Sequence, residues 1–263
     1  MKHIYLIQGE KNLNLSKYEN GSRVFIQAVW GEEPNEGVLD ARKITATEGR
    51  NLLLQHALDN YEFDYATFQD GDVIFVKGSY DEYEATLEKY NLPLYHSLDL
   101  SASNDSLRYE INYGLDREKD GDDIYFIDWI DTCFCSFRKD VIDTYLPWLT
   151  KFDHQNWWYP IVYLNILTRL KGHHWAITLN VHTDNMAHTD YTKTPGDIHP
   201  IMSRDVLKYV ITNHLDELEN MTLTGDFPWP IVKRPMNEYL KELEDGTARE
   251  LYANSNNGIT RFW

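Results

Sequence analysis

Short apolar runs alternate with helix-starting motifs along the first part of the chain, and this alternation is the feature that most limits its fold. Runs at residues 4–8, 23–29 and 65–68 predict strands, because each is short and rich in β-branched or aromatic side chains. The patterns Thr45-Ala-Thr-Glu48 and Ser79-Tyr-Asp-Glu82 are capping boxes, which predict helix starts. Strands and helices that alternate in this way predict an α/β domain.

The pattern continues and then changes towards the C-terminus. A polar segment at 99–123 is expected to be a loop. Helical spacing at 203–218 and 237–244 predicts a helical extension. We therefore predict one α/β domain over 1–195 and a C-terminal helical extension over 196–263 packed on it. Between these limits, further strands are expected at 94–98, 125–130, 132–137 and 175–181, and helices at 139–146 and 155–170.

Composition narrows the classes of function. The 263 residues carry a net charge of −17, whereas proteins that bind duplex nucleic acid present a basic face, so a nucleic-acid partner is not expected. No run approaches ~20 apolar residues, so no membrane span is expected. The apolar run after Met1 is too short for a signal peptide. Cys133 and Cys135 are one residue apart, where a mutual disulfide would be strained, so we expect reduced thiols and a cytoplasmic protein.

The segment 63–75, Phe-Asp-Tyr-Ala-Thr-Phe-Gln-Asp-Gly-Asp-Val-Ile-Phe, carries the clearest chemical signal. It predicts a buried strand that ends at Asp70, Gly71 and Asp72, and such strands point their carboxyl ends at the ligand crevice. Two carboxylates there suit a hard cation, and the glycine lets the backbone approach a phosphate. Mg²⁺ or Mn²⁺ held in this way can neutralise a nucleoside diphosphate leaving group. The alternative is an acidic hairpin turn, because Asp-Gly is a common turn dipeptide.

With this motif the chain resembles the GT-A class of nucleotide-sugar glycosyltransferases. The resemblance covers about residues 1–195 and also rests on Glu-Gly-Arg-Asn-Leu-Leu at 48–53 and Tyr-Phe-Ile-Asp-Trp-Ile-Asp-Thr-Cys-Phe-Cys-Ser-Phe-Arg at 125–138. It implies a GT-A-like, Rossmann-related mixed sheet flanked by helices, and a metal ion at Asp70 and Asp72. The implied reaction moves a sugar from a UDP- or GDP-linked donor to a hydroxyl acceptor, by default a carbohydrate.

The resemblance also implies which residues surround the donor. A third metal ligand would follow the last core strand, where His182 stands, with His188 in reserve. Imidazole beside two carboxylates suits Mn²⁺ as well as Mg²⁺. Lys11 and Arg50 are the candidate phosphate contacts, although both are equally consistent with exposed surface residues. The complete implied donor set is Gln8, Gly9, Glu10, Lys11, Arg50, Asn51, Asp70 and Gly71.

An inverting transferase of this class needs a carboxylate that takes the proton of the acceptor hydroxyl. The candidates are Asp131, Asp153 and Asp128. Segment 152–158, Phe-Asp-His-Gln-Asn-Trp-Trp, matches the family stretch that carries the base only in its tryptophans, since it lacks the glycines and has no acidic residue after them. Asp153 is equally consistent with a helix N-cap.

Two other classes of function stay open at the level of the sequence. A sugar-1-phosphate nucleotidyltransferase on a related fold usually has a Gly-rich, basic loop after its first strand, whereas residues 9–14 contain a single glycine. In a non-catalytic carbohydrate- or metal-binding protein, Asp70 and Asp72 would form a turn or a Ca²⁺ site. Titration of nucleoside diphosphates with and without Mn²⁺ separates the three.

Overall fold

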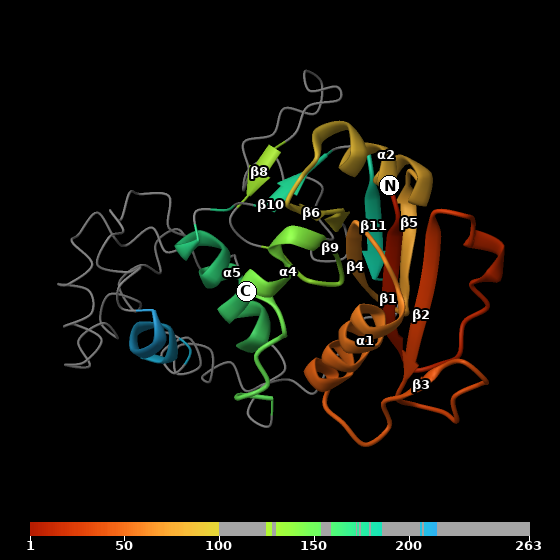
Figure 1. Ribbon diagram of the computed structural model, residues 1–263, viewed down its shortest axis with the longest axis horizontal. Coiled ribbons are helices and arrows are strands. Elements are labelled where there is room, and N and C mark those ends of the chain that lie inside the picture. The colour runs from red at the N-terminus through yellow and green to blue at the C-terminus, as the bar shows by residue number, and fades with distance from the viewer. Residues whose placement is uncertain are drawn as a thin grey trace. The chain divides into compact units, whose positions relative to one another are not determined.

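In the computed structural model the chain forms two compact units (Figure 1). The first unit comprises 1–161 and 174–189, and the second comprises 162–173 and 190–263. The predicted boundary at residue 195 stays a prediction. Within these units the described residues are 1–99, 125–127, 130–153, 159–171, 173, 175–178, 180–185, 206 and 208–214.

An eight-stranded sheet forms the centre of the first unit, in the order β3-β2-β1-β4-β9-β6-β10-β8. The first four of these strands run parallel, whereas β9 is antiparallel to both β4 and β6, and β8 is antiparallel to β10. This arrangement confirms the predicted α/β class with a mixed sheet. The bounds are β1 (His3–Gly9), β2 (Arg23–Val29), β3 (Leu39–Asp40), β4 (Tyr65–Asp70), β6 (Leu94–His96), β8 (Tyr125–Ile127), β9 (Phe134–Arg138) and β10 (Trp175–Ile177).

A second sheet of three strands has the order β5-β11-β7, with bounds β5 (Val73–Lys77), β11 (His182–Asn185) and β7 (Leu98–Asp99). Two runs that we predicted as single strands, 94–98 and 175–181, therefore differ from the structure. The first run divides between β6 and β7, and the second ends at Ile177, with β11 following it in the smaller sheet. Because Leu98 and Val181 are as buried as the strand residues before them, the apolar pattern does not show where the chain changes its pairing partner.

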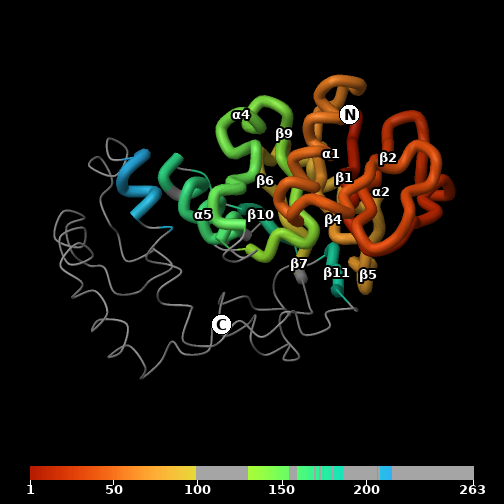
Figure 2. The backbone as a smooth tube through the Cα atoms, turned by 90° about the horizontal axis from the view of Figure 1, so that it is seen from below, coloured from red at the N-terminus to blue at the C-terminus, as the bar shows by residue number. Residues whose placement is uncertain are grey.

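Both predicted helix starts are confirmed. Helix α1 (Ala46–Asn60) begins with a complete capping box, in which the Thr45 side chain accepts from the Glu48 N–H and the Glu48 side chain accepts from the Thr45 N–H. Helix α2 (Tyr80–Tyr90) begins at Ser79, whose side chain accepts from the Glu82 N–H. Helix α1 packs on β1 and β2, and Figure 2 shows it beside them. Helix α2 shares a core cluster with β1, in which Tyr80, Tyr83 and Leu87 lie with Tyr5 and Ile7.

The remaining helices are shorter. Where we predicted one helix over 139–146, the chain forms a 3-10 turn and then a single α-helical turn. Residues 206 and 208–213 are helical, within the predicted range 203–218. No helix in the described part of the chain is long and apolar enough to cross a membrane. The bounds are η1 (Ser16–Tyr18), η2 (Lys139–Val141), α4 (Ile142–Tyr145) and α5 (Tyr159–Leu170).

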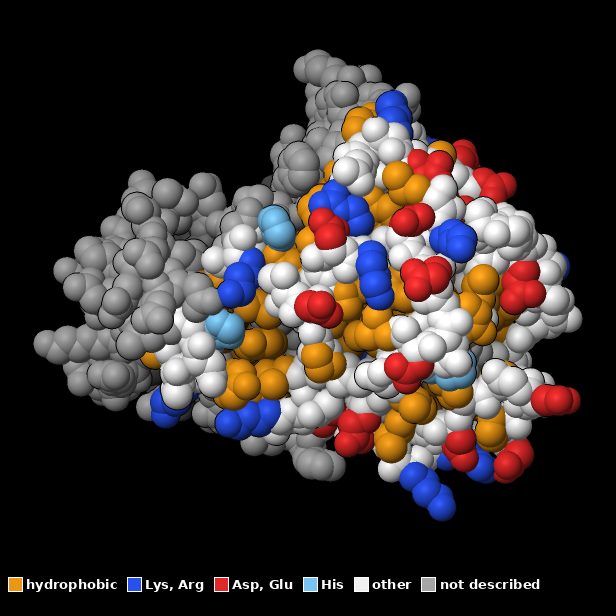
Figure 3. Space-filling model, in the orientation of Figure 1, with side chains coloured by type: hydrophobic (Ala, Val, Ile, Leu, Met, Phe, Trp, Pro, Cys, Tyr) orange, Lys and Arg blue, Asp and Glu red, His pale blue; other side chains and the backbone are white. Residues whose placement is uncertain are grey.

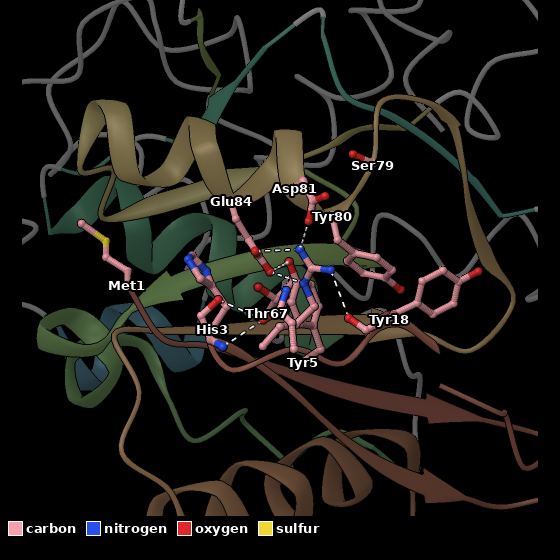
Figure 4. Close-up of polar contacts among 12 residues, drawn as sticks. Met1, His3, Tyr5, Tyr18, Thr67, Ser79, Tyr80, Asp81 and Glu84 are labelled. Atoms are coloured by element: carbon pink, nitrogen blue, oxygen red, sulfur yellow. Dashed lines mark hydrogen bonds and ion pairs between the residues drawn. The ribbon is translucent and has the colours of Figure 1, made fainter. Parts of the chain in front are cut away.

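A buried charge network joins α2 to the amino-terminal end of the sheet (Figure 4). The Arg23 guanidinium donates to Glu84 at 2.5 Å and to Asp81 at 2.5 Å, and Glu84 also accepts from the Tyr5 hydroxyl at 3.1 Å. The Arg23 side chain is 6% exposed and Glu84 11%, whereas Asp81 is 82% exposed. This network lies at the amino-terminal ends of the strands, opposite Asp70. It therefore stabilises the fold and, among the residues that the structure describes, makes no contact with the carboxyl ends of the strands.

Candidate active site

The carboxyl ends of β1, β4 and β6 and the segment that leads into β9 meet at one edge of the eight-stranded sheet. Gln8 is paired with Asp70 in the β1–β4 register. The Asp70 N–H donates to the Cys133 carbonyl at 2.8 Å, and the Gly71 N–H donates to the Gln8 carbonyl at 2.8 Å. The predicted acidic turn therefore follows a central strand of the sheet. It lies at the carboxyl ends of the strands, where ligands bind in open α/β folds.

Gly71 is required by a close approach of two backbone segments. A Cβ atom at Gly71 would lie 2.9 Å from the Cα of Gly9, and a Cβ atom at Gly9 would lie 3.2 Å from the Cα of Gly71. Contacts this short displace the backbone, so a side chain at Gly71 would move the turn that carries both acidic residues.

Arg50 of α1 neutralises the first carboxylate of the turn. Its Nη2 lies 2.7 Å from Asp70 Oδ1, and its Nη1 donates to Thr132 Oγ1 at 2.7 Å. The guanidinium carbon lies 4.8 Å from the ring centroid of Trp148. The Arg50 side chain is 13% exposed. Burial disfavours its charged form, but the negatively charged groups around it, Asp70 first among them, together outweigh burial and raise the pKa of Arg50.

The second carboxylate has a different environment. One terminal amide atom of Asn185, at the end of β11, lies 3.1 Å from Asp72 Oδ1 and 2.7 Å from Asp72 Oδ2. With the amide nitrogen in that place, Asn185 donates to both oxygens, an orientation assigned from the hydrogen-bond network. Among the described residues, no cationic side chain forms an ion pair with Asp72. Asp70 therefore has a compensating charge, whereas the described residue that contacts the Asp72 carboxylate is the neutral amide Asn185.

The chemistry of this donor set fits a divalent cation that is completed by a substrate. Magnesium is commonly bound through one or two carboxylates, water and substrate phosphates. Asp72, with Asp70 two residues before it, supplies such carboxylates. The described residues contain no group of three His, Cys, Asp or Glu side chains suited to a metal. His182 is paired with Lys77 at the other end of β11, about 10 Å along the strand from Asn185, and His188 lies outside the described residues.

The other predicted donor residues have distinct environments. Gln8 is 8% exposed, and no described residue hydrogen-bonds its buried Oε1 atom. Glu10 and Lys11 are exposed. The Asn51 amide is occupied by the backbone of Trp148, donating to its carbonyl at 2.9 Å and accepting from its N–H at 2.8 Å. Asn51 thus fixes the tryptophan that packs on Arg50.

The structure separates the three candidate bases. Asp131 is half-buried beside Thr132, close enough for its charge to help raise the pKa of Arg50. The Asp153 carboxylate accepts from the Thr45 hydroxyl, at the start of α1. Asp128 lies outside the described residues. Of the described candidates, Asp131 is the one that stands beside the Arg50–Asp70 pair.

Four residues at this edge were not predicted from the sequence: His96, Thr132, Trp148 and Asn185. His96 is 4% exposed at the end of β6, and its Nε2 contacts the Asp131 carbonyl. Each of the four lies at least 26 residues from Asp70 along the chain, so the tertiary fold and not a local pattern brings them together. A polar residue at the end of a strand is the one local signal that would have drawn attention to His96 or Asn185.

The chain resembles known proteins at the level of structure and not of sequence. No family model matches the chain, and no curated protein matches it. Solved structures that resemble it include TarS from S. aureus in complex with UDP-GlcNAc, with a TM-score of 0.47, 9% identity, and coverage of 85% of this chain and 68% of that chain. A viral example is protein A197 from STIV, with a TM-score of 0.43, 12% identity, and coverage of 70% of this chain and 84% of that chain. Similarity at this level leaves function to be argued from the site.

Proposed function

We propose that the chain is a metal-dependent glycosyltransferase that moves a sugar from a UDP- or GDP-linked donor to a hydroxyl acceptor, by default a carbohydrate. One observation supports this above all others. Asp72 follows the carboxyl end of a central strand, lacks a cationic partner among the described residues, and stands two residues from an acid that Arg50 already neutralises. Such an arrangement provides a negative charge for a divalent cation at the edge of the sheet where substrates bind.

Electrostatics explains why this site would need the metal. A nucleoside diphosphate is anionic, and the Asp72 carboxylate, which has no cationic partner in the described part of the chain, repels it. Arg50 does not offset this repulsion, because its charge is balanced by Asp70 at 2.7 Å. Mg²⁺ or Mn²⁺, held by Asp72 with Asp70 beside it, supplies the positive charge that stabilises the diphosphate leaving group.

The chain's own residues then have separate tasks. Gln8 and Gly9, at the end of β1, and exposed Lys11 would contact the nucleotide. Arg50 pairs with Asp70 and is itself held in place by Thr132 and Trp148. Asp131 is the proposed base, because a carboxylate beside the site can take the proton of the acceptor hydroxyl as it attacks the anomeric carbon.

Calorimetric titration of UDP and GDP, with Mn²⁺, with Mg²⁺ and with neither, tests this function. We expect binding that requires the metal, that is lost in Asp72→Asn, and that persists in Asp143→Asn, an exposed acidic residue of α4 that serves as a matched control. Absence of nucleotide binding with every metal would refute the proposal. Hydrolysis of a panel of nucleotide sugars then identifies the donor, whereas pyrophosphate release from a nucleoside triphosphate and a sugar phosphate would indicate a nucleotidyltransferase.

A further inference from the structure

Asn185 carries a buried amide side chain that faces the Asp72 carboxylate. It is 5% exposed, and its amide is directed at both oxygens of Asp72, at 3.1 Å and 2.7 Å. The position of its strand is well fixed, because Asn185 is paired with Val73 on β5 and the Thr183 hydroxyl is bonded to Ser97 at 2.6 Å. Because its strand is fixed, the Asn185 amide is held in position to contact the Asp72 carboxylate or an ion bound to that carboxylate.

The two ends of an amide give this contact two meanings. With nitrogen towards Asp72, the contact is a hydrogen bond to both carboxylate oxygens, which suits the protein without a cation. A half-turn of the amide brings its oxygen to the same place, 3.1 Å and 2.7 Å from the two oxygens of the Asp72 carboxylate. The amide oxygen and the carboxylate repel each other unless a cation lies between them. Neighbouring oxygens around octahedral Mg²⁺, each about 2.1 Å from the ion, are about 3.0 Å apart, which lies between the two observed distances.

We infer that Asn185, and not His182, completes the divalent-cation site with Asp72. This inference rests on the proposed function for the presence of the metal, but it assigns the third protein ligand from this chain's own geometry. An amide oxygen is a hard ligand of the kind that Mg²⁺ and Mn²⁺ accept. His182 is paired with Lys77 at the opposite end of β11, so reaching the same ion would require β11 to leave its ladder.

Titration of the full chain with Mn²⁺ alone tests the assignment. Binding is measured as the loss of the free-ion signal in electron paramagnetic resonance. We expect Asn185→Ala to weaken Mn²⁺ binding by about tenfold or more, on the scale seen when support of a metal site is removed. His182→Ala should change the Mn²⁺ affinity by less than about twofold. This is a small free-energy change, because about 1.4 kcal/mol corresponds to tenfold. Asp72→Asn is the reference variant that abolishes binding, and thermal melting confirms that each variant folds.

A further variant separates a ligand from a simple hydrogen-bond donor. Asn185→Asp provides an oxygen but no N–H, so it should bind Mn²⁺ at least as tightly as the natural chain if Asn185 is a ligand. Weakened binding in Asn185→Asp, or a loss in His182→Ala with none in Asn185→Ala, would overturn the inference. If Asp72→Asn abolishes binding in the same series, the metal site of the proposed function survives. If Asp72→Asn leaves binding unchanged, the metal site itself is wrong.

Discussion

The two acidic residues of the turn should respond to the same substitution in opposite ways. Asp70→Asn removes the charge that lies 2.7 Å from the Arg50 guanidinium, leaving a side chain that is 13% exposed without its ion-pair partner. Breaking a buried pair in this way costs about 3–5 kcal/mol. Because Asp70 is 29% exposed and Arg50 keeps its bond to Thr132, we expect about 2–3 kcal/mol, below the range for a fully buried pair. For a chain of this size that lowers the melting temperature by about 5–10 °C.

Asp72→Asn breaks no ion pair among the described residues, so its cost in unfolding free energy should stay below about 1 kcal/mol. Its effect should instead be the loss of metal-dependent nucleotide binding. Scanning calorimetry of the full chain gives the melting temperatures, and titration with UDP and Mn²⁺ gives the affinities. The double variant Arg50→Met with Asp70→Asn should cost less than the sum of the two single changes. Equal destabilisation by Asp70→Asn and Asp72→Asn would refute the division of roles.

Three further predictions concern the rest of the first unit. Glu84→Gln should lower the unfolding free energy by about 2–4 kcal/mol, and Asp81→Asn by less than about 1 kcal/mol. Both carboxylates bind the Arg23 guanidinium, but the Glu84 side chain is 11% exposed and that of Asp81 is 82% exposed. Equal melting temperatures of the two variants would contradict this. Burial lowers the pKa of His3 below 6.5, so the unfolded chain takes up a proton first and stability falls as the pH drops below about 6.5. His3→Phe should therefore flatten the plot of melting temperature against pH. An unchanged slope would be evidence against the assignment. Cys133 and Cys135 are buried, and burial raises the pKa of Cys135, so a thiol reagent should label neither in the native protein and both after unfolding; rapid native labelling would show this wrong.

Local signals in the sequence predicted the elements that depend on neighbouring residues. The capping boxes at Thr45 and Ser79 occur where the two helices begin, because an N-cap bond joins residues three apart. The strand before Asp70 was predicted from its apolar run, and the structure places its end at the carboxyl edge of the sheet. Gly71 was predicted to let the backbone approach a phosphate, which stays a prediction, and the segment that it approaches in the structure is the backbone of Gly9.

Pairings across long stretches of chain were beyond such signals. Arg50 and Asp70 are 20 residues apart, and nothing in either segment indicates that the arginine neutralises the first acid rather than a phosphate. Asn185 meets Asp72 only because β11 joins β5 in a separate sheet, where a continuous strand leading into His182 was expected. The register of that ladder decides which β11 residue faces the acidic turn, and register depends on tertiary pairing.

Surface charge gives a further contrast between composition and structure. Figure 3 shows acidic and basic side chains interspersed over the described part of one face, with no continuous basic patch there. The net charge of −17 is thus not spread as a uniform acidic surface on that face. The acidity that matters for the proposed chemistry is local, at Asp72, and composition alone could not place it.

The most direct test of the proposed metal site is a crystal of the full chain grown with Mn²⁺ and UDP, measured for the anomalous signal of manganese. We expect one strong anomalous peak bonded to an Asp72 carboxylate oxygen, with the diphosphate on its other side. A peak that lies away from Asp72, or bound UDP with no manganese near the acidic turn, would contradict it.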